Sequence, residues 1–307
     1  MGDDKRSKMD ARARAQMGLV TRAQAMSAGF SSSAIDRRLR NGELERVAPL
    51  VYRLRAGPAA STEQRLLAAC LSFGEGAMAS HRSAALLWRL DGFKDNRTPE
   101  ISVPRHRDVV IPGVTVHRRR SALDDGYCVR NGIPVTTLHR TLLDLEATLS
   151  PNALEIALDS AGRGHPDLFM EMSEFLSRHA TRGRPNGGRL DALVDLRFGG
   201  EATGSIFETR LLQIIRGARL EDPTLQHPVF KEPDHPFVHI DFAWVKRKIA
   251  LFADGMSFHV ARRRAIKDAE QRLELLKLGW NVVVVFPKML DDPKWISTFK
   301  TLFGRKP

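Results

Sequence analysis

Residues 18–54, "GLVTRAQAMSAGFSSSAIDRRLRNGELERVAPLVYRL", decide the fold of the amino-terminal part of the chain. Thr21 is a favoured N-cap for a short helix that runs to Ala28, and Gly29 permits a tight turn after it. One of the serines 31–33 caps a second helix, which Asn41-Gly42 ends after Arg40. The segments LERVAP and LVYRL then alternate apolar and polar residues as strands do. The stretch therefore predicts a winged helix-turn-helix over residues 17–56.

The second predicted helix has two faces of different chemistry. Ala34, Ile35 and Leu39 form an apolar inner face. The other face carries small polar and basic residues, as a helix that enters the major groove of DNA does. The candidate DNA-binding residues on it are Ser32, Ser33, Arg37, Arg38 and Arg40. A helical hairpin whose arginines are merely solvated is the alternative interpretation.

This stretch closely resembles the winged helix-turn-helix at the front of abortive-infection (AbiEi-like) antitoxins. The resemblance continues through "ASHRSAALLWRLDGF" and "GIPVTTLHRTLLDLEATLS" and covers roughly residues 17–160. It implies DNA binding through the helix of residues 32–40, with Arg46 and Arg53 of the wing near phosphates. It also implies a toxin or another defence-system component as a partner. A helix-turn-helix that binds a palindrome would be a homodimer.

The composition indicates a globular protein with a polyanionic partner. The 307 residues carry a net charge of +12, and twelve Lys/Arg against six Asp/Glu in residues 1–55 supply half of that excess. Nucleic acid is the commonest partner of such a chain. Cys70 and Cys128 have no CxxC neighbour, which argues against a disulfide framework and a thiolate zinc site. No apolar run or signal segment stands out, so we expect a cytoplasmic protein without a membrane partner.

Composition also predicts the division of the chain. We expect a flexible basic tail over residues 1–16, a mixed helix and strand connector over 57–180, a Gly/Pro/Arg-rich linker over 181–200 and a last domain over 201–307. The histidines of the connector lack metal-ligand spacing in the sequence, and each is interpreted as structural or surface-exposed. They are His81, His106, His117 and His139.

The last domain has the element order helix, strand, strand, helix, strand. "WNVVVVF" is so uniformly apolar that it should be buried on both faces, which predicts an α/β sheet with helices on each side. Asp241 and Asp254 stand on two successive antiparallel strands, so their carboxylates can approach each other. Glu208 on the first helix is a candidate third acid, and His259 a candidate general acid or base. Such a site would hold divalent metal for phosphodiester hydrolysis.

"SIFETR", "HIDFAW" and "KDAEQRLELLKLGWNVVVV" resemble the PD-(D/E)XK nucleases, in particular the very-short-patch repair endonuclease and related uncharacterised domains. The resemblance covers about residues 200–290. It implies a restriction-endonuclease-like fold with Mg²⁺ or Mn²⁺ on Asp241, Asp254 and the main-chain carbonyl of Ala253. Asp254 and His259 would hold the general acid/base positions. The uncharacterised group usually has an acid where this chain has Phe252.

Basic residues follow the predicted site and are candidates to hold the scissile strand, or are the solvated face of a helix: Arg262, Arg263, Arg264 and Lys267. Two functions therefore remain open. The favoured one is a metal-dependent DNA endonuclease that the amino-terminal winged helix directs to its substrate. The alternative is an antitoxin-like or transcriptional regulator with a degenerate nuclease fold. Phe252 favours the regulator, whereas the joint presence of Asp241, Asp254 and His259 favours the nuclease. Ser205-x-x-Glu208 is also a capping box and Asp254-Gly255 a common hairpin turn.

Overall fold

The computed structural model describes residues 2–58, 60–94, 98–105, 110–119, 126–165, 167–179, 188–197, 204–232, 235–254, 261–292 and 294–304. The chain divides into two compact units, Met1–Thr148 and Leu149–Pro307. Neither boundary of the predicted connector coincides with this division. No helix among the described residues is long and apolar enough to cross a membrane.

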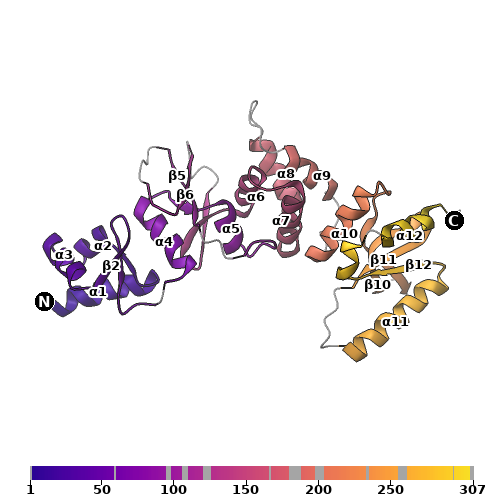
Figure 1. Cartoon of the computed structure of the whole chain (residues 1–307), viewed down its shortest axis with the longest axis horizontal. Coiled ribbons are helices and arrows are strands. Elements are labelled where there is room, and N and C mark those ends of the chain that lie inside the picture. The colour runs from indigo at the N-terminus through magenta and orange to yellow at the C-terminus, as the bar shows by residue number, and fades with distance from the viewer. Residues whose placement is uncertain are drawn as a thin grey trace. The chain divides into compact units, whose positions relative to one another are not determined.

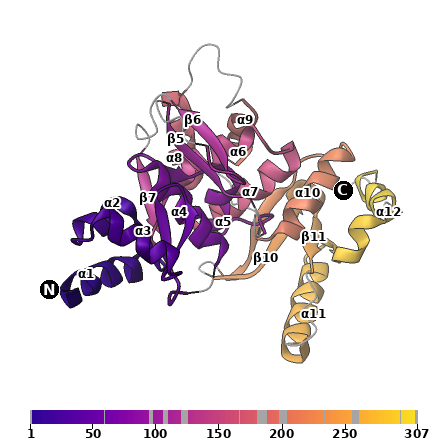
Figure 2. The same ribbon diagram turned by 60° about the vertical axis from the view of Figure 1, so that its left-hand side comes forward.

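The chain begins with a helix, α1 (Gly2–Ala15), where the sequence suggested a flexible tail over residues 1–16. Met9 and Ala13 lie four residues apart, which places them on one face of the helix. Both side chains are buried, and Met9 packs into the same core as Val20, Ile35 and Tyr52. This burial explains why a segment with many charges is helical. Figure 2 shows α1 beside the helices of the next motif.

The predicted winged helix-turn-helix follows α1. Its elements are β1 (Leu19–Thr21), α2 (Arg22–Ser27), α3 (Ser32–Arg40), β2 (Leu44–Ala48) and β3 (Val51–Leu54), with strand order β1-β3-β2. Thr21 caps α2 in a capping box with Gln24, and Ser31 caps α3. Gly29 has a φ of +99°, which favours glycine at the turn between the helices. The local rules that predicted these boundaries are confirmed.

The rest of the first unit is a five-stranded sheet with three helices. Its elements are α4 (Thr62–Phe73), β4 (Met78–Ala79), α5 (His81–Leu87), β5 (Glu100–Pro104), β6 (Thr115–Arg119), β7 (Tyr127–Arg130), β8 (Ile133–Thr136) and α6 (Leu138–Glu146), with strand order β6-β5-β4-β8-β7. Apolar residues of α4 pack against Leu19 and Val51 of the winged helix and against Ile101 and Val135 of the sheet. The winged helix and the sheet therefore share one continuous core.

The second unit begins with four helices: α7 (Pro151–Gly164), α8 (Leu168–His179), α9 (Gly188–Arg197) and α10 (Ile206–Gly217). Helix α9 lies inside the predicted linker of residues 181–200. The side chain of Arg197 is only 1% exposed and forms ion pairs with Glu155 and with Asp159 at 2.8 and 2.9 Å. Thr209 of α10 also donates a hydrogen bond to Asp159. This polar network joins the helical part to α10, so residues 188–197 belong to the packed unit.

The second unit ends in a four-stranded sheet with the order β12-β11-β10-β9. The strands are β9 (Thr224–Glu232), β10 (His235–Trp244), β11 (Ile249–Ala253) and β12 (Asn281–Val285), accompanied by η1 (Val245–Arg247), α11 (Ala261–Lys277), η2 (Pro287–Asp291) and α12 (Lys294–Phe303). Strand β9 was not predicted. Helices cover both faces: α10 and α12 pack against Phe242 and Leu251, and α11 packs through Leu275 against Ile240 and Ala250 (Figure 1).

Strand β12 differs from its prediction. It lies at the edge of the sheet, where it pairs in parallel only with β11. Val282, Val283 and Val284 are half-buried, and Val285 is buried. The expectation that this apolar run is buried on both faces was therefore wrong. An edge strand has a neighbour on one side only, which leaves part of each side chain accessible to solvent.

Candidate DNA interface and carboxylate site

Three of the arginines predicted to contact DNA are exposed and make no ion pair with the described residues. Arg37 and Arg40 lie on α3, and Arg46 lies on β2 of the wing. The charges of Arg40 and Arg46 help to hold the pKa of Asp36 below its ordinary value, after the larger effect of the hydrogen bond from Arg22. These three side chains are the candidate phosphate contacts that the structure leaves accessible.

Two other arginines predicted to contact DNA form ion pairs with nearby acids. Arg38 donates to Glu43 at 2.6 Å, and its guanidinium lies 4.7 Å from the ring centroid of Phe30. Arg53 pairs with Glu45 on the neighbouring strand. Both arginines are only partly exposed. Their charges are compensated within the fold, which separates them from Arg37, Arg40 and Arg46.

Arg22 ties the two helices together, and the sequence did not indicate this. Its Nη1 donates to Asp36 at 2.9 Å and to the hydroxyl of Tyr52 at 3.0 Å. Its Nη2 donates to the hydroxyl of Ser32, so this predicted DNA contact already has an intramolecular partner. Ser33 is exposed, and its hydroxyl lies 3.0 Å from that of Ser31. Arg22 therefore fixes the orientation of α3 relative to α2.

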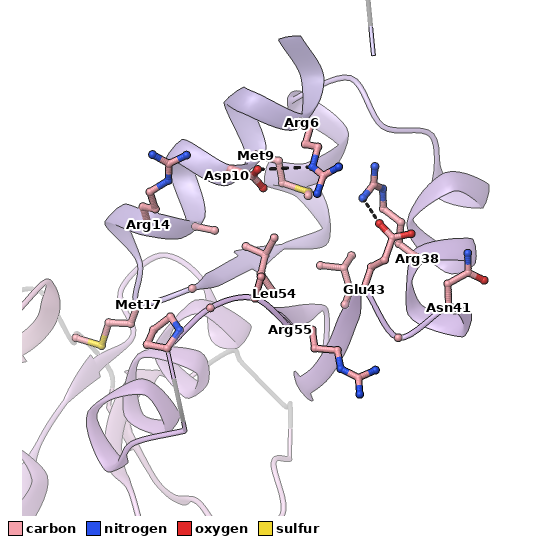
Figure 3. A pocket seen from close by; sticks show the side chains of 17 residues that line it. Arg6, Met9, Asp10, Arg14, Met17, Arg38, Asn41, Glu43, Leu54 and Arg55 are labelled. Atoms are coloured by element: carbon pink, nitrogen blue, oxygen red, sulfur yellow. Dashed lines mark hydrogen bonds and ion pairs between the residues drawn. The ribbon is translucent and has the colours of Figure 1, made fainter. Parts of the chain in front are cut away.

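A cavity of about 780 Å³ lies between α1, the end of α3 and the wing (Figure 3). Met9, Ala13, Leu44 and Leu54 contribute apolar surface to it. Two ion pairs lie at its border, Arg6 with Asp10 and Arg38 with Glu43. The cavity separates α1 from the wing on one side of the motif.

The second unit brings two of the predicted acids together. Glu208 on α10 and Asp241 on β10 both accept a hydrogen bond from Nε2 of Gln226, at 3.0 and 3.1 Å. Asp241 also accepts the main-chain N–H of Ala253 at 2.8 Å. Glu208 accepts the N–H of Gly204 at 2.7 Å. We refer to Glu208, Gln226 and Asp241 as the carboxylate site.

Both carboxylates are held in an unfavourable environment for charge. Burial raises the pKa of Glu208, and the charge of Asp241 raises it further. Burial also raises the pKa of Asp241, against the hydrogen bonds from Ala253 and Gln226. No lysine or arginine of the described residues forms an ion pair with either acid. Glu208 is buried and Asp241 half-buried, and both carry the hard oxygen atoms that divalent metal ions prefer as ligands.

Gln226 was missed by the sequence analysis. It lies in β9 with a φ of +47°, in the left-handed region that a residue with a side chain rarely adopts. Such conformations persist only where the surrounding structure enforces them, and they are frequent at functional sites. A glutamine in a strand is not a distinctive pattern, so no sequence signal identified this residue.

The remaining predicted site residues are less well joined to this site. Asp254 lies close enough for its charge to raise the pKa of Asp241, but its own carboxylate faces Arg272, with Nη2 to Oδ2 at 3.4 Å. Lys267 is exposed on α11. His259 and the side chains of Arg262, Arg263 and Arg264 lie outside the described residues. Ser205 caps α10 through one hydrogen bond, since its hydroxyl accepts the N–H of Glu208 at 3.2 Å, whereas the Glu208 carboxylate accepts the N–H of Gly204.

Comparison with known proteins identifies the amino-terminal region. No curated protein matches the chain significantly. The chain is similar to the crystal structure of the RV2827C protein from Mycobacterium tuberculosis at 17% identity, over 72% of this chain and 83% of that chain, with a TM-score of 0.43. Residues 7–55 match the family described as "Transcriptional regulator, AbiEi antitoxin". Together with the winged helix-turn-helix geometry, this match places an AbiEi-antitoxin transcriptional-regulator domain at residues 7–55 of the chain.

Proposed function

We propose that the chain is a DNA-binding regulator of the antitoxin type, which contacts operator DNA through α3 and the wing. This was the alternative in the sequence analysis, and the family match over residues 7–55 favours it over the nuclease. The observation that carries the proposal is the set of exposed, unpaired arginines on α3 and β2. Such side chains supply phosphate contacts, while the amino-terminal residues of a recognition helix contact base edges.

A footprinting experiment tests the proposal. The full chain is incubated with DNA from upstream of its own gene and with random DNA of equal length, both in EDTA. A regulator protects a defined site and binds it at least about 10³-fold more tightly than random DNA at physiological salt. Equal affinity for both DNAs would contradict the proposal. Two protected half-sites one helical turn apart would support a homodimer.

The antitoxin class also supports a partner protein. Operator binding by such a regulator would be linked to the capture of a toxin, so we propose a toxin encoded beside it as that partner. Copurification of the neighbouring gene product with the full chain tests this. Recovery of the chain without that product would contradict it.

A metal-dependent endonuclease is the second candidate, and one observation favours it. The buried Glu208 and the half-buried Asp241 have raised pKa values and share one amide donor, and neither forms an ion pair with the described residues. In an extended strand the N–H and C=O of one residue point to the same side. Because the N–H of Ala253 donates to Asp241, we expect the carbonyl of Ala253 to face the same position. These oxygen atoms would hold Mg²⁺ or Mn²⁺, and that ion would supply charge neutralisation and an activated water.

A plasmid assay separates the two candidates. Supercoiled DNA is incubated with the full chain in Mg²⁺, Mn²⁺ or EDTA, beside Asp241→Ala and Asp222→Ala, an exposed acid of the same unit. Nicking that needs metal and is lost only in Asp241→Ala would establish the endonuclease. Intact plasmid in all lanes, with DNA binding retained, would refute the endonuclease and leave the regulator as the remaining candidate.

A further inference from the structure

A second group of metal-ligating side chains lies in the first unit and belongs to neither proposed function. His81 is the first residue of α5, Glu100 begins β5, and His117 lies in β6. One ligand atom of each residue lies within 4.8 Å of the ligand atoms of the other two. We refer to these three residues as the His-Glu-His site. The sequence analysis interpreted both histidines as structural or surface-exposed.

Backbone contacts hold the three residues in place. Strands β5 and β6 are parallel neighbours in which His117 pairs with Ser102, two residues beyond Glu100. His117 is therefore a diagonal neighbour of Glu100 on the same face of the sheet, with Nε2 to Oε2 at 3.3 Å. The start of α5 is tied to Glu100 from both sides: the N–H of Ser80 donates to its carbonyl, and its own N–H donates to the hydroxyl of Ser83. The site is therefore built by three elements that share one core.

His81 shows two features that a purely structural histidine does not require. Its φ is +50°, in the left-handed region, at the first position of a helix. The Ser80 hydroxyl makes no capping bond to the helix, and instead lies 3.1 Å from Nδ1 of His81. An outer hydrogen bond of this kind fixes the tautomer and orientation of a ligating imidazole and leaves Nε2 for the ion.

The site is enclosed but reachable. His81 is 7% exposed and the Glu100 side chain 12%, whereas the His117 side chain is 27% exposed and opens the site to solvent. The rings of His81 and His117 are stacked, with centroids 3.5 Å apart. Imidazole binds a metal in the plane of its ring, so one ring must rotate on binding. Rotation of the more exposed His117 ring meets this requirement with the least displacement of packed atoms.

Two arginines near the site are paired with a different acid. Arg119 and Arg140 lie near His81, and both pair with the buried carboxylate of Asp144. That pairing compensates much of their positive charge.

From this geometry we infer that His81, Glu100 and His117 bind Zn²⁺ or a similar first-row transition-metal ion. Two imidazoles and one carboxylate suit such an ion, with a water as the fourth ligand, whereas Mg²⁺ prefers oxygen ligands alone. Zn–N and Zn–O bonds of about 2.0–2.2 Å place tetrahedral ligand atoms roughly 3.4 Å apart. The site must therefore contract slightly, which the rotation of His117 provides. Occupancy would fix α5 against β5 and β6.

Metal binding by the full chain tests the inference, with the protein free of any histidine tag and stripped with EDTA. Zn²⁺ is added and bound metal is measured by mass spectrometry and calorimetry, and Co²⁺ reports tetrahedral coordination through its visible absorption. We expect one tightly bound Zn²⁺ per chain that Mg²⁺ in excess does not displace. Binding should also raise the melting temperature, because only the folded state holds the ion.

Variants separate this site from the carboxylate site. His117→Ala should weaken Zn²⁺ binding by more than about a hundredfold, and Ser80→Ala by about 10–100-fold, the usual effect of an outer partner. Glu100→Gln keeps the size of the side chain and should also weaken Zn²⁺ binding. It therefore tests the site even if His117→Ala disturbs folding. His239→Ala, an exposed histidine, and Asp241→Ala should bind as the wild type. Absence of stoichiometric Zn²⁺ in the wild type, or unchanged binding in both His117→Ala and Glu100→Gln, would overturn the inference.

Discussion

Alanine substitution of the exposed arginines should weaken DNA binding by an amount that counterion release predicts. Each phosphate contact contributes about −0.9 to the slope of log K against log salt. At about 0.15 M salt one lost contact therefore lowers the affinity about fivefold. If Arg37, Arg40 and Arg46 each meet one phosphate, the triple variant loses about two orders of magnitude and about 2.7 units of slope per chain.

The ion pairs of the wing provide matched controls. Arg38 lies on α3, and Arg53 lies on β3, the strand next to β2; both carry the same charge as the exposed arginines, but Glu43 and Glu45 already compensate them. Their replacement by alanine should lower the affinity and the slope by less than any of the three exposed arginines does. The comparison holds net charge change constant and varies only the pairing.

Fluorescence anisotropy of a labelled duplex between about 50 and 200 mM salt measures both quantities. The assay is run in EDTA, so that cleavage does not contribute. Melting temperatures check folding, since exposed substitutions usually change stability by less than about 0.5 kcal/mol. If the triple variant kept the wild-type slope, α3 and the wing would not be the DNA-binding surface. If Arg38→Ala and Arg53→Ala matched Arg37→Ala, the ion pairs would not govern which arginines reach phosphate.

Three further predictions concern stability. Arg197→Met leaves buried acids unpaired and should lower the free energy of unfolding in urea by about 3–5 kcal/mol. Arg247→Met breaks an exposed ion pair and should lower it by about 0–1 kcal/mol. Equal losses in the two variants would contradict a stabilising role of the Arg197 ion pairs. Raised pKa values of Glu208 and Asp241 mean that the folded state binds protons more tightly than the unfolded state, so this stabilisation is complete below their ordinary values and disappears as pH rises through the raised ones. In EDTA the stability of the wild type relative to Asp241→Asn should therefore increase as pH is lowered from neutral, and a constant difference would refute the pKa directions. Gly29→Ala places a side chain at a φ of +99° and should cost at least about 1 kcal/mol, while Gly164→Ala, a helical position with open space, should not destabilise.

The amino-terminal motif was largely determined by the sequence itself. Thr21 and Ser31 cap their helices by accepting N–H groups three residues further on, and Gly29 and Gly42 adopt positive φ at the predicted stops. These interactions span a few residues, so residue type and spacing are sufficient to specify them. The free and paired arginines of this motif could not be separated in the same way, because Glu43 and Glu45 reach them only after the wing folds.

Long-range packing decided the elements that the sequence analysis misassigned. Residues 2–15 form a packed helix because the side chains of Met9 and Ala13 are buried. Residues 188–197 of the predicted linker form a packed helix because the buried Arg197 pairs with Asp159. Val282, Val283 and Val284 of β12 are half-exposed because no strand of the described residues pairs with its outer edge. The composition of a segment does not determine which other segments of the chain it packs against.

Both candidate metal sites depend on the tertiary structure. The acids Glu208 and Asp241 were identifiable as residue types, but Gln226 joins them only because β9, β10 and α10 converge. His81, Glu100 and His117 lack any ligand spacing along the chain, and they meet because a helix start and two parallel strands share one end of a sheet. Backbone hydrogen bonds and caps act between near neighbours and can be predicted from a string of residues. A ligand set needs side chains from distant segments to converge within a few ångströms, and only the packing of the whole unit fixes that.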